Sequence, residues 1–175
     1  MTRGIVTPDD RARSLWSKSD LLCDRPALLE LVLAAAEVRG RAYAPYSGFA
    51  VGAALRTTTG KVFVGVNVEN ASYPVSCCAE RSVVCAAVTA GELHFDAIAI
   101  VTDATTPAAP CGQCRQTLCE FGLDLHVILA SAAGAVWSAR LRELLPAAFT
   151  PDSFEPRPGR TGPGSNGHDD LEDLE

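Results

Sequence analysis

The chain has 175 residues and a mass of 18.4 kDa, a length typical of one domain that can bury a core without disulfides. Its composition is 47% apolar and 21% charged, and no apolar run reaches the roughly 18 residues of a membrane-spanning helix. The net charge of −6 is uneven, because residues 155–175 carry −4 and the first 154 residues only −2. A near-neutral body with an acidic tail lacks the basic surface that binding to nucleic acid polymers or anionic membranes usually requires, but it does not exclude a small neutral substrate.

The N-terminus and the cysteines indicate a compartment. The first 16 residues contain no apolar segment of the kind that a signal peptide needs. Seven cysteines in such a chain are more typical of thiols or metal ligands than of a disulfide framework. We therefore expect a cytoplasmic protein.

Hydrophobic periodicity predicts an N-terminal arm at 1–25, a domain at 26–154 and a disordered, acidic, Pro/Gly-rich tail at 155–175. The predicted elements of the domain are a helix at 26–41, strands at 49–57 and 61–68 joined by a hairpin turn, a helix at 78–90, a strand at 97–103, a helix at 111–122, strands at 125–130 and 135–139, and a short helix at 141–146. This order is typical of a three-layer α/β fold with a mixed five-stranded sheet and helices on both faces. Only four residues, 131–134, join the last two strands, so these strands should be antiparallel.

Three cysteines have the spacing of metal ligands: Cys78 in SCCAER, and Cys111 and Cys114 in PCGQC. A C-x-x-C pair at a helix start puts two sulfurs within reach of one ion, and the helix dipole favours their thiolates. With Cys78 at another helix start, three protein ligands leave a fourth position for water, which is the pattern of catalytic zinc. Glu80 is a carboxylate that can take a proton from that water and return it to a leaving group. Ligand-x-Glu followed by Pro-Cys-x-x-Cys is the signature of zinc-dependent nucleobase deaminases.

Other interpretations of the cysteines remain open. A C-x-x-C alone also fits a thioredoxin-like redox pair. Cys77 could close a structural four-cysteine site, although adjacent residues bind one ion awkwardly. The cysteines outside the triad are expected to be small buried apolar residues, namely Cys23, Cys77, Cys85 and Cys119.

The sequence resembles the small, homotetrameric cytidine deaminases with three cysteine ligands. The similarity runs from about residue 28 to 154 and rests on YAPYSGFAVGAAL, GVNVENASYP, CCAERS and PCGQCRQTLCEFG. It implies the cytidine deaminase-like fold, a homotetramer, and one Zn²⁺ per chain. It also implies hydrolysis of cytidine and 2′-deoxycytidine to uridine and 2′-deoxyuridine with release of ammonia, a reaction of pyrimidine salvage. Larger dimeric relatives have a histidine where Cys78 stands.

The resemblance further implies a role for each matching residue. Zinc would be bound by Cys78, Cys111 and Cys114, with Glu80 as the proton shuttle. The substrate would be bound by Asn67 and Glu69 at the ribose 3′-hydroxyl, by Phe49 against the pyrimidine ring, and by the backbone N–H of Ala79 at the 2-oxo group, while Tyr73 and Phe149 would complete the sites of neighbouring subunits. Three thiolates leave zinc with a net negative charge, and Arg81 is placed to donate hydrogen bonds to their sulfurs and withdraw that charge.

Three further functions compete with cytidine deamination. Aminonucleoside deaminases, such as blasticidin S deaminase, share the cysteine motifs but differ around the ribose site, whereas this chain has the complete stretch NVENASYP and an arginine after Glu80. A polynucleotide-editing deaminase is disfavoured by the short final hairpin and the negative charge. A structural zinc module without turnover is disfavoured by a glutamate beside an open ligand position.

Overall fold

The computed structural model of the chain describes residues 10–153. Its elements in chain order are α1 (Asp10–Trp16), α2 (Pro26–Arg39), β1 (Val51–Thr57), β2 (Val62–Val66), a 3₁₀ turn (Tyr73–Val75), α3 (Ala79–Thr89), β3 (Phe95–Thr102), α4 (Gly112–Cys119), β4 (His126–Ser131), β5 (Val136–Arg140), α5 (Leu141–Leu144) and a second 3₁₀ turn (Pro151–Ser153). The predicted domain elements from residue 26 onward are all present, with ends that shift by one to three residues.

The five strands form one mixed sheet in the order β2-β1-β3-β4-β5. β1 pairs antiparallel with β2 and β3, β3 pairs parallel with β4, and β4 pairs antiparallel with β5. The fold class and the antiparallel final hairpin predicted from the sequence are therefore confirmed. The crossover from β3 to β4 contains α4, as a parallel connection requires.

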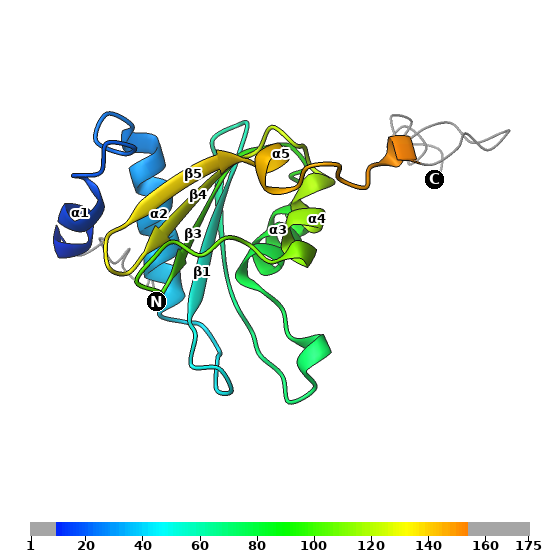
Figure 1. Cartoon of the computed structure of the whole chain (residues 1–175), viewed down its shortest axis with the longest axis horizontal. Helices are drawn as coiled ribbons and strands as arrows, with labels where there is room; N and C mark the ends of the chain where they lie inside the picture. The colour runs from blue at the N-terminus through cyan, green and yellow to red at the C-terminus, as the bar shows by residue number, and fades with distance from the viewer. Residues whose placement is uncertain (1–9, 154–175) are drawn as a thin grey trace, which may run out of the picture.

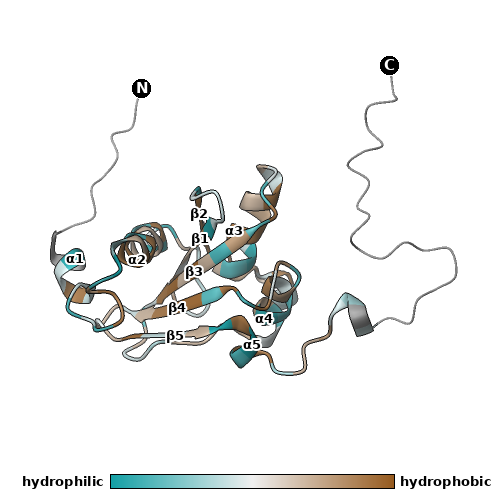
Figure 2. Cartoon of the chain, turned by 90° about the horizontal axis from the view of Figure 1, so that it is seen from above, coloured by the Kyte–Doolittle hydropathy of each residue, from teal (hydrophilic) through white to brown (hydrophobic). Residues whose placement is uncertain are grey.

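Helices cover both faces of the sheet, and Figures 1 and 2 show the three layers, with α1 and α2 on one side and α3 and α4 on the other. The α2 side buries Leu31, Val32 and Ala35 against small strand residues such as Ala54 and Ala99. The α3 side buries a second cluster that includes Leu55, Val83 and Leu129. Because both faces of β3 are covered, seven of its eight residues are buried, as its continuous apolar sequence predicts.

Two glycines let the helices approach the hairpin closely. A Cβ on Gly52 would lie 2.1 Å from the carbonyl oxygen of Ala35 in α2. A Cβ on Gly65 would lie 2.6 Å from the backbone nitrogen of Val83 and 2.9 Å from the carbonyl oxygen of Ala79, both in α3. The absence of a side chain at Gly65 thus sets the distance between the sheet and the helix that begins at the cysteine motif.

Residues 10–25 of the N-terminal arm pack on the α2 face, which the sequence did not predict. Trp16 at the end of α1 is only 3% exposed, and its Nε1 donates a hydrogen bond to the carbonyl oxygen of Ser131 at 3.1 Å. Leu22 in the following turns is fully buried. The arm therefore adds Trp16 and Leu22 to the hydrophobic cluster between α2 and the sheet, beside the end of β4.

The four cysteines outside the triad do not all lie in the core. Cys119 is buried as expected, but Cys23 and Cys85 are exposed and Cys77 is half-buried, so the expectation that these cysteines fill the core is wrong for them. Cys85 lies on the outer face of α3, and Cys23 in the turn before α2, where no second layer covers them.

The predicted disordered tail, 155–175, lies outside the described residues. Among residues 10–153, no helix has the length and apolar content needed to cross a membrane.

Candidate active site

Three cysteine sulfurs meet where α3 and α4 begin. Cys78 is the residue before the first turn of α3, Cys111 is the residue before α4, and Cys114 lies in the first turn of α4. Their Sγ atoms all lie within 4.8 Å of one another. Both helices therefore begin at the sulfurs, and the positive ends of their dipoles favour thiolates there. The structure thus brings together the three residues that the sequence predicts as ligands, although Cys78 and Cys111 are 33 positions apart in the sequence.

The donor set fits zinc. Tetrahedral zinc with Zn–S bonds of about 2.3 Å places its sulfurs about 3.8 Å apart, within the separation found here. A hydrogen bond from the thiol of Cys114, together with the neighbouring Cys111 and Arg81, lowers the pKa of Cys78 to about 5, while the same bond raises that of Cys114. A zinc ion would replace the shared proton, since it binds cysteine as thiolate.

Glu80 lies at the first turn of α3 and is buried, with only 5% of its surface exposed. Burial raises the pKa of its carboxyl group, and the negative charge of Cys78 raises it further. A carboxyl group with a raised pKa beside an open metal position can both accept and return a proton near neutral pH. This is the second chemical requirement for a hydrolytic site, after the metal ligands.

Arg81 reaches back from α3 toward the cysteine motif. Its Nη2 donates a hydrogen bond to the carbonyl oxygen of Ser76 at 2.7 Å, and it also hydrogen-bonds Cys78 and lowers its pKa. Within the described residues, the buried Nε of Arg81 has no hydrogen-bond partner. The guanidinium is therefore held beside the thiolates, in the position that charge withdrawal from the sulfurs requires.

Asn67 and Glu69 follow β2 and both hold the segment that leads into β1. Asn67 Oδ1 accepts from the N–H of Val51 at 2.8 Å, and its Nδ2 donates to the carbonyl oxygen of Phe49 at 2.9 Å. Glu69 accepts hydrogen bonds from the backbone N–H and hydroxyl groups of the Tyr46–Ser47 turn. These bonds, led by that from the Ser47 hydroxyl, lower the pKa of Glu69, which is therefore ionised. Each side chain retains hydrogen-bonding capacity for a ligand hydroxyl.

The other predicted substrate residues differ in position. Ala79 is buried, and its backbone N–H belongs to the first turn of α3, where N–H groups lack an intrahelical partner. Phe49 is partly exposed in the segment that Asn67 holds. Tyr73 and Phe149 are 70% and 57% exposed; Tyr73 packs edge-on against Tyr46 with ring centroids 5.9 Å apart.

Sequence reasoning missed two side chains that support the site. Arg115, directly after Cys114, donates from Nε to the carbonyl oxygen of Pro110 at 2.7 Å and from Nη1 to that of Leu144 at 2.9 Å. Gln116 donates to the carbonyl oxygen of Phe149 at 2.7 Å. Both fasten the C-terminal segment to α4 beside the cysteines. Their position directly after C-x-x-C was visible in the sequence, but Leu144 and Phe149, which they bind, lie 29 and 33 residues later.

Comparison with known proteins identifies the family. The profile described as "Cytidine and deoxycytidylate deaminase zinc-binding region" matches residues 27–130. The chain belongs to this family. The cytidine deaminase of Halalkalibacterium halodurans is 43% identical over 125 residues, which cover 71% of this chain and 95% of that protein. The cytidine deaminase of Mycobacterium tuberculosis is 43% identical over 120 residues, 69% of this chain and 87% of that protein.

Solved structures of family members agree. The crystal structure of cytidine deaminase from Burkholderia pseudomallei aligns with a TM-score of 0.67 and 50% identity, covering 69% of this chain and 97% of that chain. That of the Mycobacterium tuberculosis enzyme aligns with a TM-score of 0.61 and 41% identity, covering 69% and 95%. The resemblance stated from the motifs is confirmed, and the family's zinc-binding region includes all three cysteines.

Proposed function

We propose that this member of the family catalyses the hydrolytic deamination of cytidine and 2′-deoxycytidine, giving uridine or 2′-deoxyuridine and ammonia. The observation that carries this function is the set of three converging cysteine sulfurs with a buried glutamate of raised pKa beside it. A structural zinc site would have a fourth protein ligand, and the residues described here gather only three around this point.

Zinc, held by Cys78, Cys111 and Cys114, would supply a Lewis acid that makes water a nucleophile at neutral pH. Glu80 takes a proton from the attacking water and delivers it to N3 of the cytosine ring, which makes C4 electrophilic. After attack at C4, Glu80 transfers the remaining hydroxyl proton to the 4-amino group. Ammonia then leaves, so that one water is consumed for each ammonia released.

Neighbouring groups orient the substrate in this proposal. The N–H of Ala79 binds the 2-oxo group, and Phe49 packs against the pyrimidine ring. Asn67 and Glu69 hold the ribose 3′-hydroxyl, one as donor and the other as acceptor. Because both also hold the segment that carries Phe49, the ribose contact and the ring contact are mechanically linked.

We also propose a homotetramer in the cytoplasm. Tyr73 and Phe149 are large apolar side chains that the single chain leaves mostly exposed, and in a tetramer they would complete neighbouring sites. All seven cysteines are free thiols, which suits a reducing compartment. Light scattering tests the tetramer: a mass near 18.4 kDa, that of one chain, would contradict it.

The decisive experiment compares Glu80→Gln with the wild type. Ultraviolet-monitored deamination is measured on cytidine, 2′-deoxycytidine and blasticidin S, with zinc quantified in the same samples. We expect about one zinc per chain in both proteins, rapid loss of cytidine with the wild type and at least about 10²-fold slower turnover with the variant. The matched control is Glu92→Gln, a glutamate that pairs with Lys61 away from the cysteines. Unchanged turnover by Glu80→Gln would refute the proton shuttle, and turnover of blasticidin S alone would refute the substrate.

A further inference from the structure

Basic side chains gather on the α2 face of the sheet, on the opposite side from the cysteines. Arg56 of β1 pairs with Ala97, Ala97 with His126 of β4, and His126 with Arg140 of β5, so these positions form one row across the strands. Ala97 packs in the core beneath α2, and paired positions share a face, so the row lies on the α2 side.

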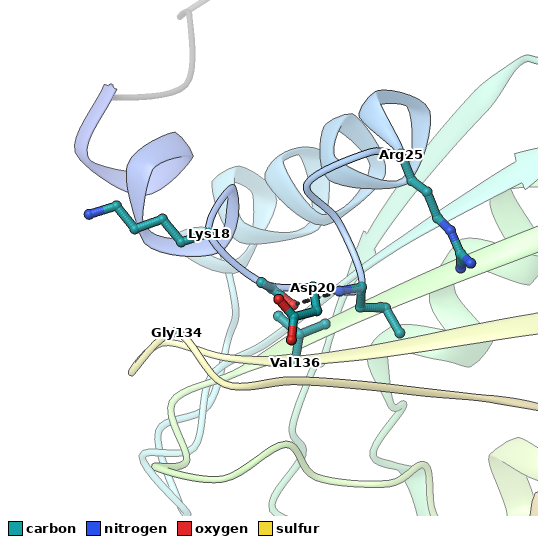
Figure 3. A pocket seen from close by; sticks show the side chains of 7 residues that line it. Lys18, Asp20, Arg25, Gly134 and Val136 are labelled. Atoms are coloured by element: carbon teal, nitrogen blue, oxygen red, sulfur yellow. Dashed lines mark hydrogen bonds between the residues drawn. The ribbon is translucent and has the colours of Figure 1, made fainter.

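Arg25 stands directly before α2, and its charge acts on His126. Figure 3 shows its side chain reaching from the start of α2 over the strands, and Arg25 also lines, with Lys18 and Asp20, a shallow hollow of about 640 Å³. Among the described residues, Arg25 takes part in none of the ion pairs. The positive charge of Arg25 is therefore without a counter-ion from residues 10–153.

The positive charges of the row exceed the negative ones. Among the described groups whose charge acts on His126, Asp96 is the one carboxylate, and it is bound by Arg56 through both Nε and Nη2, at 2.9 and 2.8 Å. Arg140 uses only Nη1, which donates to the carbonyl oxygen of Asp124. Burial lowers the pKa of His126, and the charges of Arg140, Arg25 and Arg56 lower it further against the opposing effect of Asp96. Positive charges that face one another repel, and this repulsion destabilises the fold. A bound anion would relieve it.

We propose that Arg25, His126 and Arg140 form a binding site for a phosphate-class oxyanion, either inorganic phosphate or the phosphate group of a small organic phosphate. Guanidinium groups match such oxyanions with several directed N–H donors. Arg56 adds positive charge to the site, but its Nε and Nη2 already donate hydrogen bonds to Asp96, so it has fewer N–H groups for an anion. The 14-residue helix α2 has no acidic residue in its first turn, so its dipole also favours an anion beside Arg25. The site lies across the sheet from the cysteines and does not depend on the deaminase reaction.

Binding at this site should couple to protonation. An anion beside His126 favours the imidazolium, so it raises the pKa of the ring, and by linkage the anion binds more tightly as the pH falls. The groups that face His126 are Arg25 from α2, Arg56 from β1, Asp96 from β3 and Arg140 from β5. Sulfate keeps its charge from about pH 6 to 8, so any change in its affinity over this range must come from a protein group that titrates there. Histidine is the side chain that ordinarily does so.

The test is isothermal titration calorimetry on the zinc-loaded full-length protein with sulfate, inorganic phosphate and uridine 5′-monophosphate, at constant ionic strength. We expect saturable binding of sulfate and phosphate that Arg25→Ala weakens about tenfold or more. Arg41→Ala, which removes an exposed arginine at the opposite end of α2, should bind like the wild type. His126→Asn should flatten the pH dependence for sulfate. Tighter binding of the nucleotide than of phosphate would identify an organic phosphate as the ligand, and the reverse would identify the free ion.

Two results would overturn the proposal. One is the absence of saturable sulfate and phosphate binding by the wild type at millimolar concentrations. The other is an equal loss of affinity in Arg25→Ala and Arg41→Ala, which would indicate a diffuse charge effect. Arg25 is exposed, so its replacement leaves the core intact, and thermal melting of each variant verifies the fold.

Discussion

Gly65→Ala tests whether the spacing between β2 and α3 sets the geometry of the active site. The added Cβ would lie 2.6 Å from the backbone nitrogen of Val83 and 2.9 Å from the carbonyl oxygen of Ala79. Ordinary contacts begin at 3.4 Å, so α3 or β2 has to move by about 0.8 Å at the closest point. The neighbours are backbone atoms, which cannot rotate aside as a side chain can. The displaced helix begins with the residue between Cys78 and Glu80.

The expected effects follow from this displacement. Overpacking of this kind costs about 1–3 kcal/mol of folding free energy. For a chain of this size, a loss of about 2 kcal/mol lowers Tm by roughly 4–8 °C. A shift of nearly 1 Å in the position of a catalytic group reduces turnover by up to about 10²-fold. We therefore expect kcat to fall further than the loss of folded protein at 25 °C can explain.

Steady-state kinetics, thermal melting and zinc content are measured together on Gly65→Ala and on Gly40→Ala. Gly40 is the matched control, because its Cβ would meet its nearest neighbour at 3.7 Å and its backbone is right-handed. The control should keep wild-type values for Tm and kcat. If Gly65→Ala has wild-type Tm and kcat, the close approach of β2 to α3 does not control the site. If Tm falls but kcat does not, the glycine matters for packing alone.

Three further predictions concern the arm, the metal-free cysteines and the amide that holds the substrate segment. Trp16→Ala should cost about 3–5 kcal/mol by emptying a buried site, while Trp16→Phe, which removes the hydrogen bond to Ser131 and only part of the ring volume, should cost about 1–2 kcal/mol; urea unfolding measures both, and equal losses would contradict the packing role. In metal-free protein the pKa of Cys78 is about 5, below its ordinary value near 9. The stabilisation of the fold by this thiolate is therefore present at high pH and is lost as the pH falls through 5. The rate of alkylation of Cys78 by iodoacetamide should have its midpoint near pH 5, and a midpoint near 9 would refute the assignment. Asn67→Ala leaves two backbone groups without their partner, so both a lower Tm and a higher KM for cytidine are expected, and an unchanged KM would exclude the ribose role.

The sequence predicted best those elements whose surroundings are uniform. β3 is covered on both faces, so its apolar run is readable without knowing its partners. Trp16 gave no signal, because its short helix shows no sustained apolar period and its burial depends on the end of β4, more than 100 residues away. The expectation for Cys85 failed because a cysteine on a helix has no local feature that indicates which face is covered.

The candidate site divides in the same way. The cysteines and Glu80 could be predicted because each lies within a turn of a helix start, where short-range spacing sets the geometry. The bonds from Asn67 and Glu69 to the segment before β1 could not be predicted, because they depend on how the hairpin folds back on itself. The juxtaposition of Arg25, His126 and Arg140 depends on strand register and on how α2 packs on the sheet, and no local sequence pattern indicates either.

The positions of the three sulfurs also bear on how the chain folds and unfolds. Under the proposed ligation, the metal joins α3 to α4 across the 33 positions between Cys78 and Cys111, and β3 lies inside that loop. A crosslink closing a loop of this length limits the unfolded chain by an amount on the order of 3–4 kcal/mol in the chain-entropy account. While the metal is bound, the starts of α3 and α4 stay joined even when the segment between them unfolds. The ion that serves the reaction would thus also stabilise the fold, and its removal should lower the free energy of unfolding as well as abolish turnover.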